Sequence, residues 1–191
     1  MKNLFTTTVL SNLFVTVAFA QGTIAFQNFS SPSFFAPDYL SDGATKLSGP
    51  QYMAELFAGP NTTSLSAIAT TPFLSGSSAG FFNGGTQVIP NVPAGGSAFA
   101  QVDVWNTAIG ASFDQAKATG LPNAWAQSTI FPVTTGSPDG GVPTPPGILT
   151  GLTPLSLNGV PEPSTIALIG LGAAVVFLSN LATRLSLAKR S

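Results

Sequence analysis

The ten residues SAFAQVDVWN at positions 97–106 alternate strictly between two kinds of side chain. One set is small and aliphatic and the other is larger or polar: Ala98, Ala100, Val102 and Val104 against Phe99, Gln101, Asp103 and Trp105. A period of two places the first set on one face of a β-strand and the second set on the other. This segment therefore predicts a strand with one face in a hydrophobic core.

Shorter runs of β-forming residues, separated by Gly, Pro and Asn, continue outward from this strand. The expected strands are 23–29, 52–57, 71–74, 86–89, 128–131 and 153–157, with the short run 81–82 before the turn signal Asn83-Gly84-Gly85. Pro72 predicts an edge strand because proline cannot donate to a ladder. Residues 136–147 read as a Pro/Gly connector. Residues 112–119 predict the one helix of this region, capped by Ser112 and ended by Gly120 and Pro122. The predicted fold is all-β, a two-sheet β-sandwich of seven to eight short strands with one short helix.

The amino-acid composition argues against several classes of function. The chain has no His and no Cys, which excludes Ser-His and Cys-His nucleophile systems and imidazole metal ligands. Residues 21–158 carry two lysines against six carboxylates, a net charge of −4, which argues against nucleic acid as a partner. We expect no enzyme, no catalytic residue, no metal site and no cofactor.

Three groups of side chains still allow a binding or catalytic role. Glu55 and Asp103 lie on predicted strands and could approach each other across a sheet as a glycosidase pair, although solvated strand positions are the favoured interpretation. Asp38 and Asp42 could ligate calcium, but turn formation is favoured. Three aromatic residues could stack on a sugar ring, or could instead pack beneath the helix at 112–119 or form the core: Phe99, Trp105 and Trp125.

The first twenty residues predict a secretory signal peptide. Lys2 precedes an apolar stretch that ends in Ala18-Phe19-Ala20, the small-residue pattern of signal peptidase sites. We therefore expect residues 1–20 to be removed and the mature chain to begin at Gln21. An uncleaved signal anchor is the alternative.

The last thirty residues predict a membrane segment. Residues 165–183 form a mostly apolar run of 19 residues, roughly 28 Å as a helix and about the thickness of a bilayer core. The basic residues Arg184, Lys189 and Arg190 follow it and predict a cytoplasmic C-terminus. Alternatives are a buried core helix, a GPI signal or a plain uncleaved anchor.

A polar motif stands directly before this segment: Val160, Pro161, Glu162, Pro163, Ser164 and Thr165. With the apolar run and the basic end, it resembles the PEP-CTERM sorting signal of exported bacterial proteins. The resemblance covers roughly residues 160–191 and departs from the family in its delayed basic cluster. It implies recognition and cleavage by an exosortase, a membrane-embedded transpeptidase-like protease, in a diderm bacterium that makes extracellular polysaccharide.

Residues 21–158 also look similar to a small group of PEP-CTERM proteins with no activity to transfer. The shared segments are 20–23, 49–52, 58–60 and 83–85.

Three segments follow from these observations: a signal peptide at 1–20, an exported β-rich domain at 21–158 and a sorting signal at 159–191, whose basic tail spans 184–191. The predicted function is a non-enzymatic structural or adhesive protein of the cell surface or matrix. Its expected partners are signal peptidase, exosortase, the membrane and extracellular polysaccharide. Alternatives are a carbohydrate-binding module, an uncleaved single-pass anchored protein and, least favoured, a carboxylate-dependent glycan hydrolase.

Overall fold

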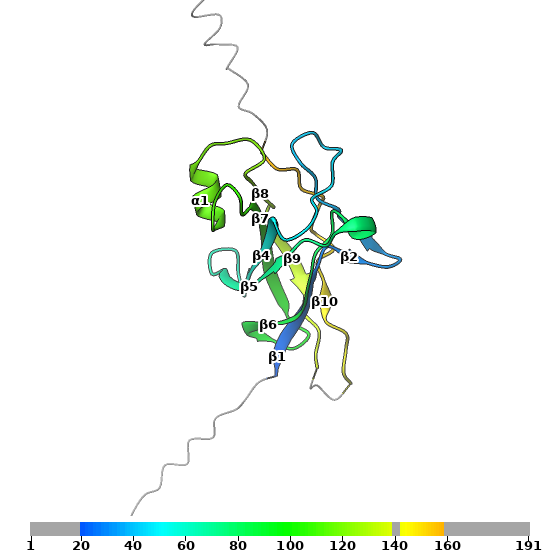
Figure 1. Ribbon diagram of the computed structural model, residues 1–191. Helices are drawn as coiled ribbons and strands as arrows, with labels where there is room; N and C mark the ends of the chain where they lie inside the picture. Colours follow the sequence, from blue (N-terminus) through cyan, green and yellow to red (C-terminus); the bar gives the residue numbers. More distant parts are fainter. Residues whose placement is uncertain (1–19, 139–141, 159–191) are drawn as a thin grey trace, which may run out of the picture.

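The computed structural model describes residues 20–138 and 142–158. This part of the chain is mostly β, with ten strands in three sheets, one short α-helix and one 3-10 turn, η1 at Gly76–Ser78 (Figure 1). The all-β class with one short helix is thereby confirmed. The strand count exceeds the predicted seven to eight because three strands are only two residues long: β2 at Phe29–Ser30, β3 at Phe34–Phe35 and β10 at Gly147–Ile148.

The larger sheet is built around β7. Its order is β5-β4-β7-β8, and β9 also pairs with β7. The strands span Ser66–Pro72 (β5), Tyr52–Gly59 (β4), Ser97–Asn106 (β7), Trp125–Gln127 (β8) and Phe131–Thr134 (β9). Strand β7 has the predicted bounds, and β5 is the predicted edge strand, although it begins five residues before Thr71.

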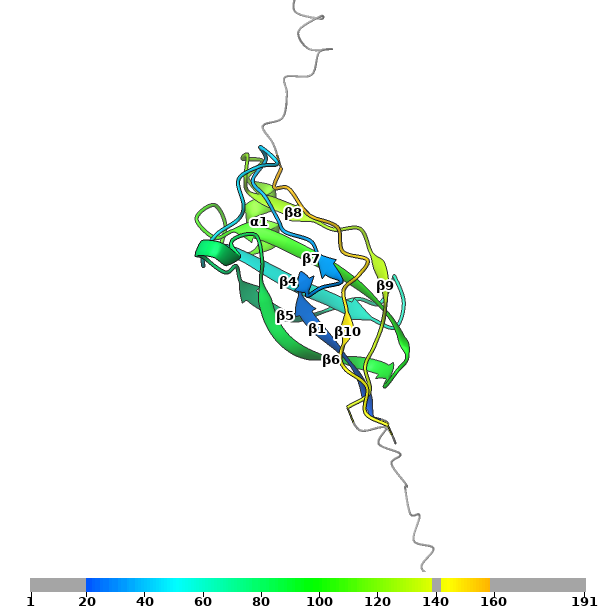
Figure 2. The same cartoon turned by 90° about the vertical axis from the view of Figure 1, so that its right-hand side faces the viewer.

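A three-stranded sheet of order β10-β1-β6 faces the larger sheet (Figure 2). Strand β1 (Gln21–Gln27) pairs antiparallel with β6 (Asn83–Pro93) and parallel with β10. The remaining sheet is the short pair β2-β3.

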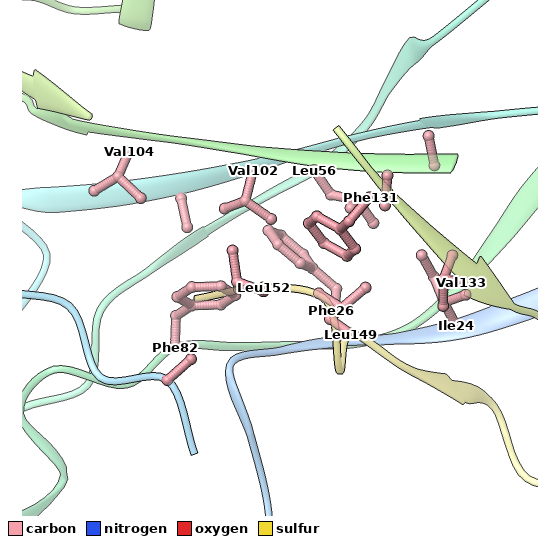
Figure 3. Close-up of a cluster of buried hydrophobic side chains, with 14 of the residues drawn as sticks. Ile24, Phe26, Leu56, Phe82, Val102, Val104, Phe131, Val133, Leu149 and Leu152 are labelled. Atoms are coloured by element: carbon pink, nitrogen blue, oxygen red, sulfur yellow. The ribbon is translucent and has the colours of Figure 1, made fainter. Parts of the chain in front are cut away.

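One hydrophobic core fills the space between the two larger sheets (Figure 3). The inner face of β7 contributes the four aliphatic residues that the alternation predicts, and none of their side chains is exposed to solvent. Phe26 of β1 packs against Phe82 with ring centroids 5.1 Å apart, and Phe82 also contacts Phe73 at 5.4 Å. Burying each such ring stabilises the fold by about 2 kcal/mol. A core of this kind fits a domain that holds together without disulfides.

The predicted hairpin at Asn83-Gly84-Gly85 is wrong. These residues begin the long strand β6, and the register against β1 shifts between the pairs Gln27–Asn83 and Ala25–Thr86. The turn-forming residues serve this bulge instead, since Asn83 Oδ1 accepts the Gly85 N–H at 3.0 Å. Gly84 lies flat against Phe26, where a Cβ would come within 2.4 Å of the ring. Packing against the core therefore decides the use of a sequence that favours a turn.

Two other predicted strands differ from the structure. Residues 128–130 separate β8 from β9, because Ser128 bonds Val102 through its backbone N–H and its hydroxyl oxygen, at 2.9 Å each. Residues 153–157 form an extended segment with a single bridge, between Ser156 and Tyr39. Pro154 cannot donate a backbone hydrogen bond there, and the N–H of Leu155 goes to a side chain, so a regular ladder does not form.

The predicted signal peptide and membrane segment lie outside the described residues. Within residues 20–138 and 142–158, no helix has the length and hydropathy needed to cross a bilayer.

Candidate functional site

The outer face of the larger sheet brings the two candidate acids together. Glu55 of β4 and Asp103 of β7 are direct partners in the antiparallel register. Direct partners have Cβ atoms about 5 Å apart, and like charges at that separation are unfavourable. Glu55 is half-buried and Asp103 is only 3% exposed. The strands therefore hold two carboxyl groups side by side at some cost to stability.

Helix α1 (Phe113–Ala118) covers one side of these acids. Ser112 caps it as predicted, its Oγ accepting the Gln115 N–H at 3.3 Å. Helix and sheet together border a groove of about 260 Å³. Its lining combines the acids with polar and aromatic side chains: Glu55, Phe57, Gln101, Asp103, Ser112, Phe113, Asp114, Lys117 and Gln127. We call this the outer groove.

Hydrogen bonds fix the polar wall of the outer groove. Gln127 Nε2 donates to Asp103 Oδ1 at 2.9 Å, and Gln101 Nε2 donates to the Ser128 carbonyl at 3.1 Å. Sequence reasoning did not single out Phe57, Gln101 or Gln127. The period of two that places Glu55 and Asp103 on this face also places Phe57 and Gln101 there, so the signal was present for those two.

Burial raises the pKa of both acids. For Glu55 the second cause is the negative charge of Asp103, followed by that of Asp114. For Asp103, burial raises the pKa, the Gln127 hydrogen bond and the charge of Lys117 lower it, and Asp114 raises it. The net effect is upward for each, so this pair takes up a proton more readily than free carboxyl groups do.

The three candidate stacking aromatics do not form one platform. Trp105 is 5% exposed and packs with Phe113, Ala116 and Ala124 under α1. Its Nε1 has no hydrogen-bond partner among the described residues. The packing alternative therefore applies to Trp105, since a ring must be open on one face to stack on a sugar.

Trp125 and Phe99 lie in different surroundings. Trp125 is half-buried, with its ring edge-on to Phe113 at 5.7 Å and Lys117 Nζ 4.6 Å from its centroid. Phe99 lies near the opposite end of β7, opposite Gly59 of β4, and does not line the outer groove. Lys117 and Phe113 thus contact the Trp125 ring, which would have to be open on one face to stack on a sugar.

The candidate calcium pair is split between two environments. Asp42 is exposed and closes its own turn by accepting the N–H groups of Ala44 and Thr45 at 2.9 and 2.8 Å. Those bonds and the Thr45 hydroxyl lower its pKa. Asp38 is completely buried, and among the described residues no group of three His, Cys, Asp or Glu side chains could hold a metal ion.

Asp38 belongs to a buried polar knot centred on Asn28. The Asn28 side chain donates to the carbonyls of Ala36 (2.8 Å) and Gly80 (2.9 Å) and accepts the Phe82 N–H (2.9 Å). Asp38 Oδ1 accepts the Leu155 N–H at 2.8 Å. Burial raises the pKa of Asp38 well above its ordinary value, and the bonds from Leu155 and Asn28 offset this only partly. The knot ties the C-terminal segment to the first strands.

That C-terminal segment, residues 147–158, is bound to the domain along its length, and we call it the strap. Its side chains Leu149, Leu152 and Leu157 are buried. The backbone N–H of Tyr39 donates to the Leu155 carbonyl (2.8 Å), and the backbone carbonyl of Tyr39 accepts the Leu157 N–H (2.9 Å).

Asn158, the last described residue, holds the end of the strap with five hydrogen bonds. Its Oδ1 accepts the N–H groups of Ala124 and Trp125 at 2.9 Å, and its Nδ2 donates to the Leu121 carbonyl at 2.7 Å. Its backbone N–H donates to the Trp125 carbonyl and its carbonyl accepts the Asn123 N–H, both at 2.8 Å. The chain is therefore held in place up to residue 158.

At the other end, Ala20 is the first described residue, and it is already bonded to the domain. The Ala20 carbonyl accepts the Ala94 N–H at 2.9 Å, and Gln21 already pairs with Pro93. The first and last described residues of the domain lie at opposite ends of it in both views (Figures 1 and 2).

The sequence immediately beyond Asn158 matches a known family model. Residues 159–180 match the model of the PEP-CTERM protein-sorting motif. The chain carries a PEP-CTERM sorting motif. No curated protein and no solved structure matches the chain. The PEP-CTERM match implies an exosortase as the processing partner, and it implies export and sorting to the surface.

The individual sorting residues lie outside the described residues. The PEP-CTERM match includes all six predicted motif positions, from Val160 to Thr165. The basic residues Arg184, Lys189 and Arg190 lie beyond the matched range, and Ala18 precedes the first described residue. Their roles stay predictions.

Proposed function

We propose that this chain is a non-enzymatic protein of the cell surface or extracellular matrix, delivered and then cut free by two processing enzymes. Signal peptidase would cut after Ala20, and an exosortase would cut at the Pro161-Glu162-Pro163 motif. Until the second cut, the segment 165–183 would hold the protein in the inner membrane of a diderm bacterium with its C-terminus in the cytoplasm. The released product would contain the β-sandwich of residues 21–158 and the few residues up to the cut in the motif.

One observation carries this proposal. Among the described residues, regular pairing begins at Gln21, directly after the predicted signal cleavage site, and Asn158, directly before the PEP-CTERM match at residue 159, is held by five hydrogen bonds. Cleavage after Ala20 would remove one hydrogen bond, from the Ala94 N–H to the Ala20 carbonyl, and cleavage at the motif would leave Asn158 and its bonds in place. Bonds that hold both Gln21 and Asn158 to the domain are expected if residues 21–158 are the cargo and the flanks are signals.

Glu162→Ala tests the role of the motif. We expect the variant to accumulate at precursor size in the membrane fraction, whereas the native chain appears at mature size, as followed by blotting with antibody against the domain. Ser186→Ala, which lies beyond the matched residues, is a control for a general effect of substitution near the C-terminus. Unchanged processing and release of Glu162→Ala would contradict cleavage at the motif and favour the plain membrane anchor.

The outer groove supports a second candidate function, the binding of extracellular saccharide. Carboxylates accept hydrogen bonds from sugar hydroxyls, amides accept and donate them, and the half-buried Phe57 ring supplies apolar contact. We therefore propose Phe57, Glu55 and Asp103 as the saccharide contacts, in place of Trp105 and Trp125.

Two matched phenylalanine variants test the saccharide proposal. Phe57 and Phe99 are both half-buried on the same face of the sheet, but only Phe57 lines the outer groove. On a glycan array, Phe57→Ser should lower the affinity for any bound glycan about fivefold, the usual worth of one ring contact, and Phe99→Ser should not. Equal losses would contradict binding in the groove. Hydrolysis of a bound glycan that Glu55→Gln abolishes would instead support the hydrolase alternative.

A further inference from the structure

Only one residue, Gly159, separates Asn158 from the first residue of the sorting motif. Val160 is only two residues beyond Asn158, and an extended chain advances at most about 3.6 Å per residue. The motif therefore starts within about 7 Å of Asn158. A protease that binds residues 160–165 therefore works close to the surface around Asn158.

That surface is a rigid collar made from two loops, residues 40–45 and 119–123. The Ser41 N–H donates to Asn123 Oδ1 at 2.7 Å and joins the loops, while Asn123 donates its N–H to the Asn158 carbonyl. Asn123 adopts φ 56°, a conformation that costs energy for a residue with a side chain and that these bonds hold in place.

The first loop is rigid for a separate reason. The Leu40 N–H donates to the Thr45 carbonyl at 2.8 Å, and the Asp42 carboxylate accepts two further N–H groups within the loop. The bond from the Thr45 hydroxyl and those two N–H bonds lower the pKa of Asp42. The collar also presents Leu121, an apolar side chain that is 51% exposed.

We propose that this collar is a docking face for the processing exosortase, which reads it together with the PEP-CTERM motif. This inference rests on the proposed function. The partner is the outer surface of a membrane-embedded protease that offers an apolar contact to Leu121. The position of the motif favours this partner, because the enzyme that binds residues 160–165 is the one brought within a few residues of the collar.

Flexible insertions of four and twelve Gly/Ser residues between Asn158 and Gly159 separate the motif from the collar. The full-length precursors are co-expressed with the exosortase and followed by pulse-chase. If the collar contributes to docking, both insertions slow conversion to mature size, the longer one by about tenfold, because the linked contact loses effective concentration. If the domain merely obstructs the protease, both insertions speed conversion, and that result overturns the proposal, as does an unchanged rate.

A pair of surface variants tests the contact without changing chain length. Leu121→Ser removes the exposed side chain of the collar, and Val88→Ser removes one of equal exposure (50%) on β6, away from the collar. We expect conversion to slow about fivefold for Leu121→Ser, the loss of a partly buried aliphatic contact, and to stay at the native rate for Val88→Ser. Equal rates for the two variants would overturn the proposal.

Glu162→Ala in the same assay separates the two ideas. If that variant is processed normally, cleavage at the motif fails and with it the premise of the docking face. If it is blocked while the insertions and Leu121→Ser convert at the native rate, the cleavage proposal stands and the docking face alone fails.

Discussion

The two faces of the β4–β7 pair differ in burial and in the kind of side chain that they carry. Toward the core, every residue of β7 from Ala98 to Val104 at a spacing of two is aliphatic and fully buried. Toward α1, the same strands carry Glu55, Phe57 and Asp103, a mixture that the helix covers only in part. Burial of the inner face stabilises the domain. That stabilisation offsets the cost of the two adjacent acids on the other face. Substitutions on the two faces should therefore differ in size and in sign.

The largest effect is expected on the inner face. Leu56→Ala leaves a cavity in a site with no exposure, so the free energy of unfolding should fall by about 2–5 kcal/mol. Denaturant titration of residues 21–158 measures it. A loss below about 1 kcal/mol would mean that the two faces do not differ as described.

A smaller loss is expected under the helix. Phe113 anchors α1 in a cluster of only four buried side chains, so Phe113→Ala should cost about 2 kcal/mol, less than the inner-face change, and should free α1 selectively. Hydrogen exchange should show lost protection in residues 113–118 while β4 and β7 stay protected. Global loss of protection would make the helix part of the main core.

The smallest effect should have the opposite sign. Because Glu55 and Asp103 have raised pKa values in the folded state, the folded protein binds protons more readily than the unfolded chain, and these groups make stability fall as pH rises. Glu55→Gln should therefore raise the free energy of unfolding at pH 8, by about 0.5 kcal/mol as for other cross-strand charge pairs.

That gain should vanish as the pH approaches about 4, the ordinary pKa of a carboxyl group. Asp38 and Asp114 remain in both proteins, so the difference between variant and native chain isolates the Glu55 contribution. A destabilising Glu55→Gln at pH 8 would show that the pair is held by attraction that the charges alone do not explain.

The comparison also separates what sequence can predict from what it cannot. The bounds of β7, its buried face and the Ser112 cap depend on neighbours within a few residues, so the sequence predicts them. The pairing of Glu55 with Asp103 joins positions 48 residues apart, and only the observed register places them opposite each other.

Errors arose where distant packing competed with a local signal. Asn83-Gly84-Gly85 favours a turn by itself, but the ring of Phe26 requires a flat glycine in a continuous strand. The sequence could not predict that the strap is bound to the rest of the domain, because its hydrogen bonds join residues far apart in the chain. Leu155 donates to Asp38, 117 residues away, and Asn158 accepts from Ala124, 34 residues away.

The knot at Asn28 has a practical consequence for anyone producing this protein. Asn28-Phe29-Ser30 and Asn61-Thr62-Thr63 both fit the N-glycosylation sequon. Asn61 is exposed and can carry a sugar, but the Asn28 amide is wholly buried and bonded on both sides. A eukaryotic secretory host that modified Asn28 during synthesis would yield a chain unable to close its interior, so bacterial production or a Ser30→Ala change is the safer route to native material.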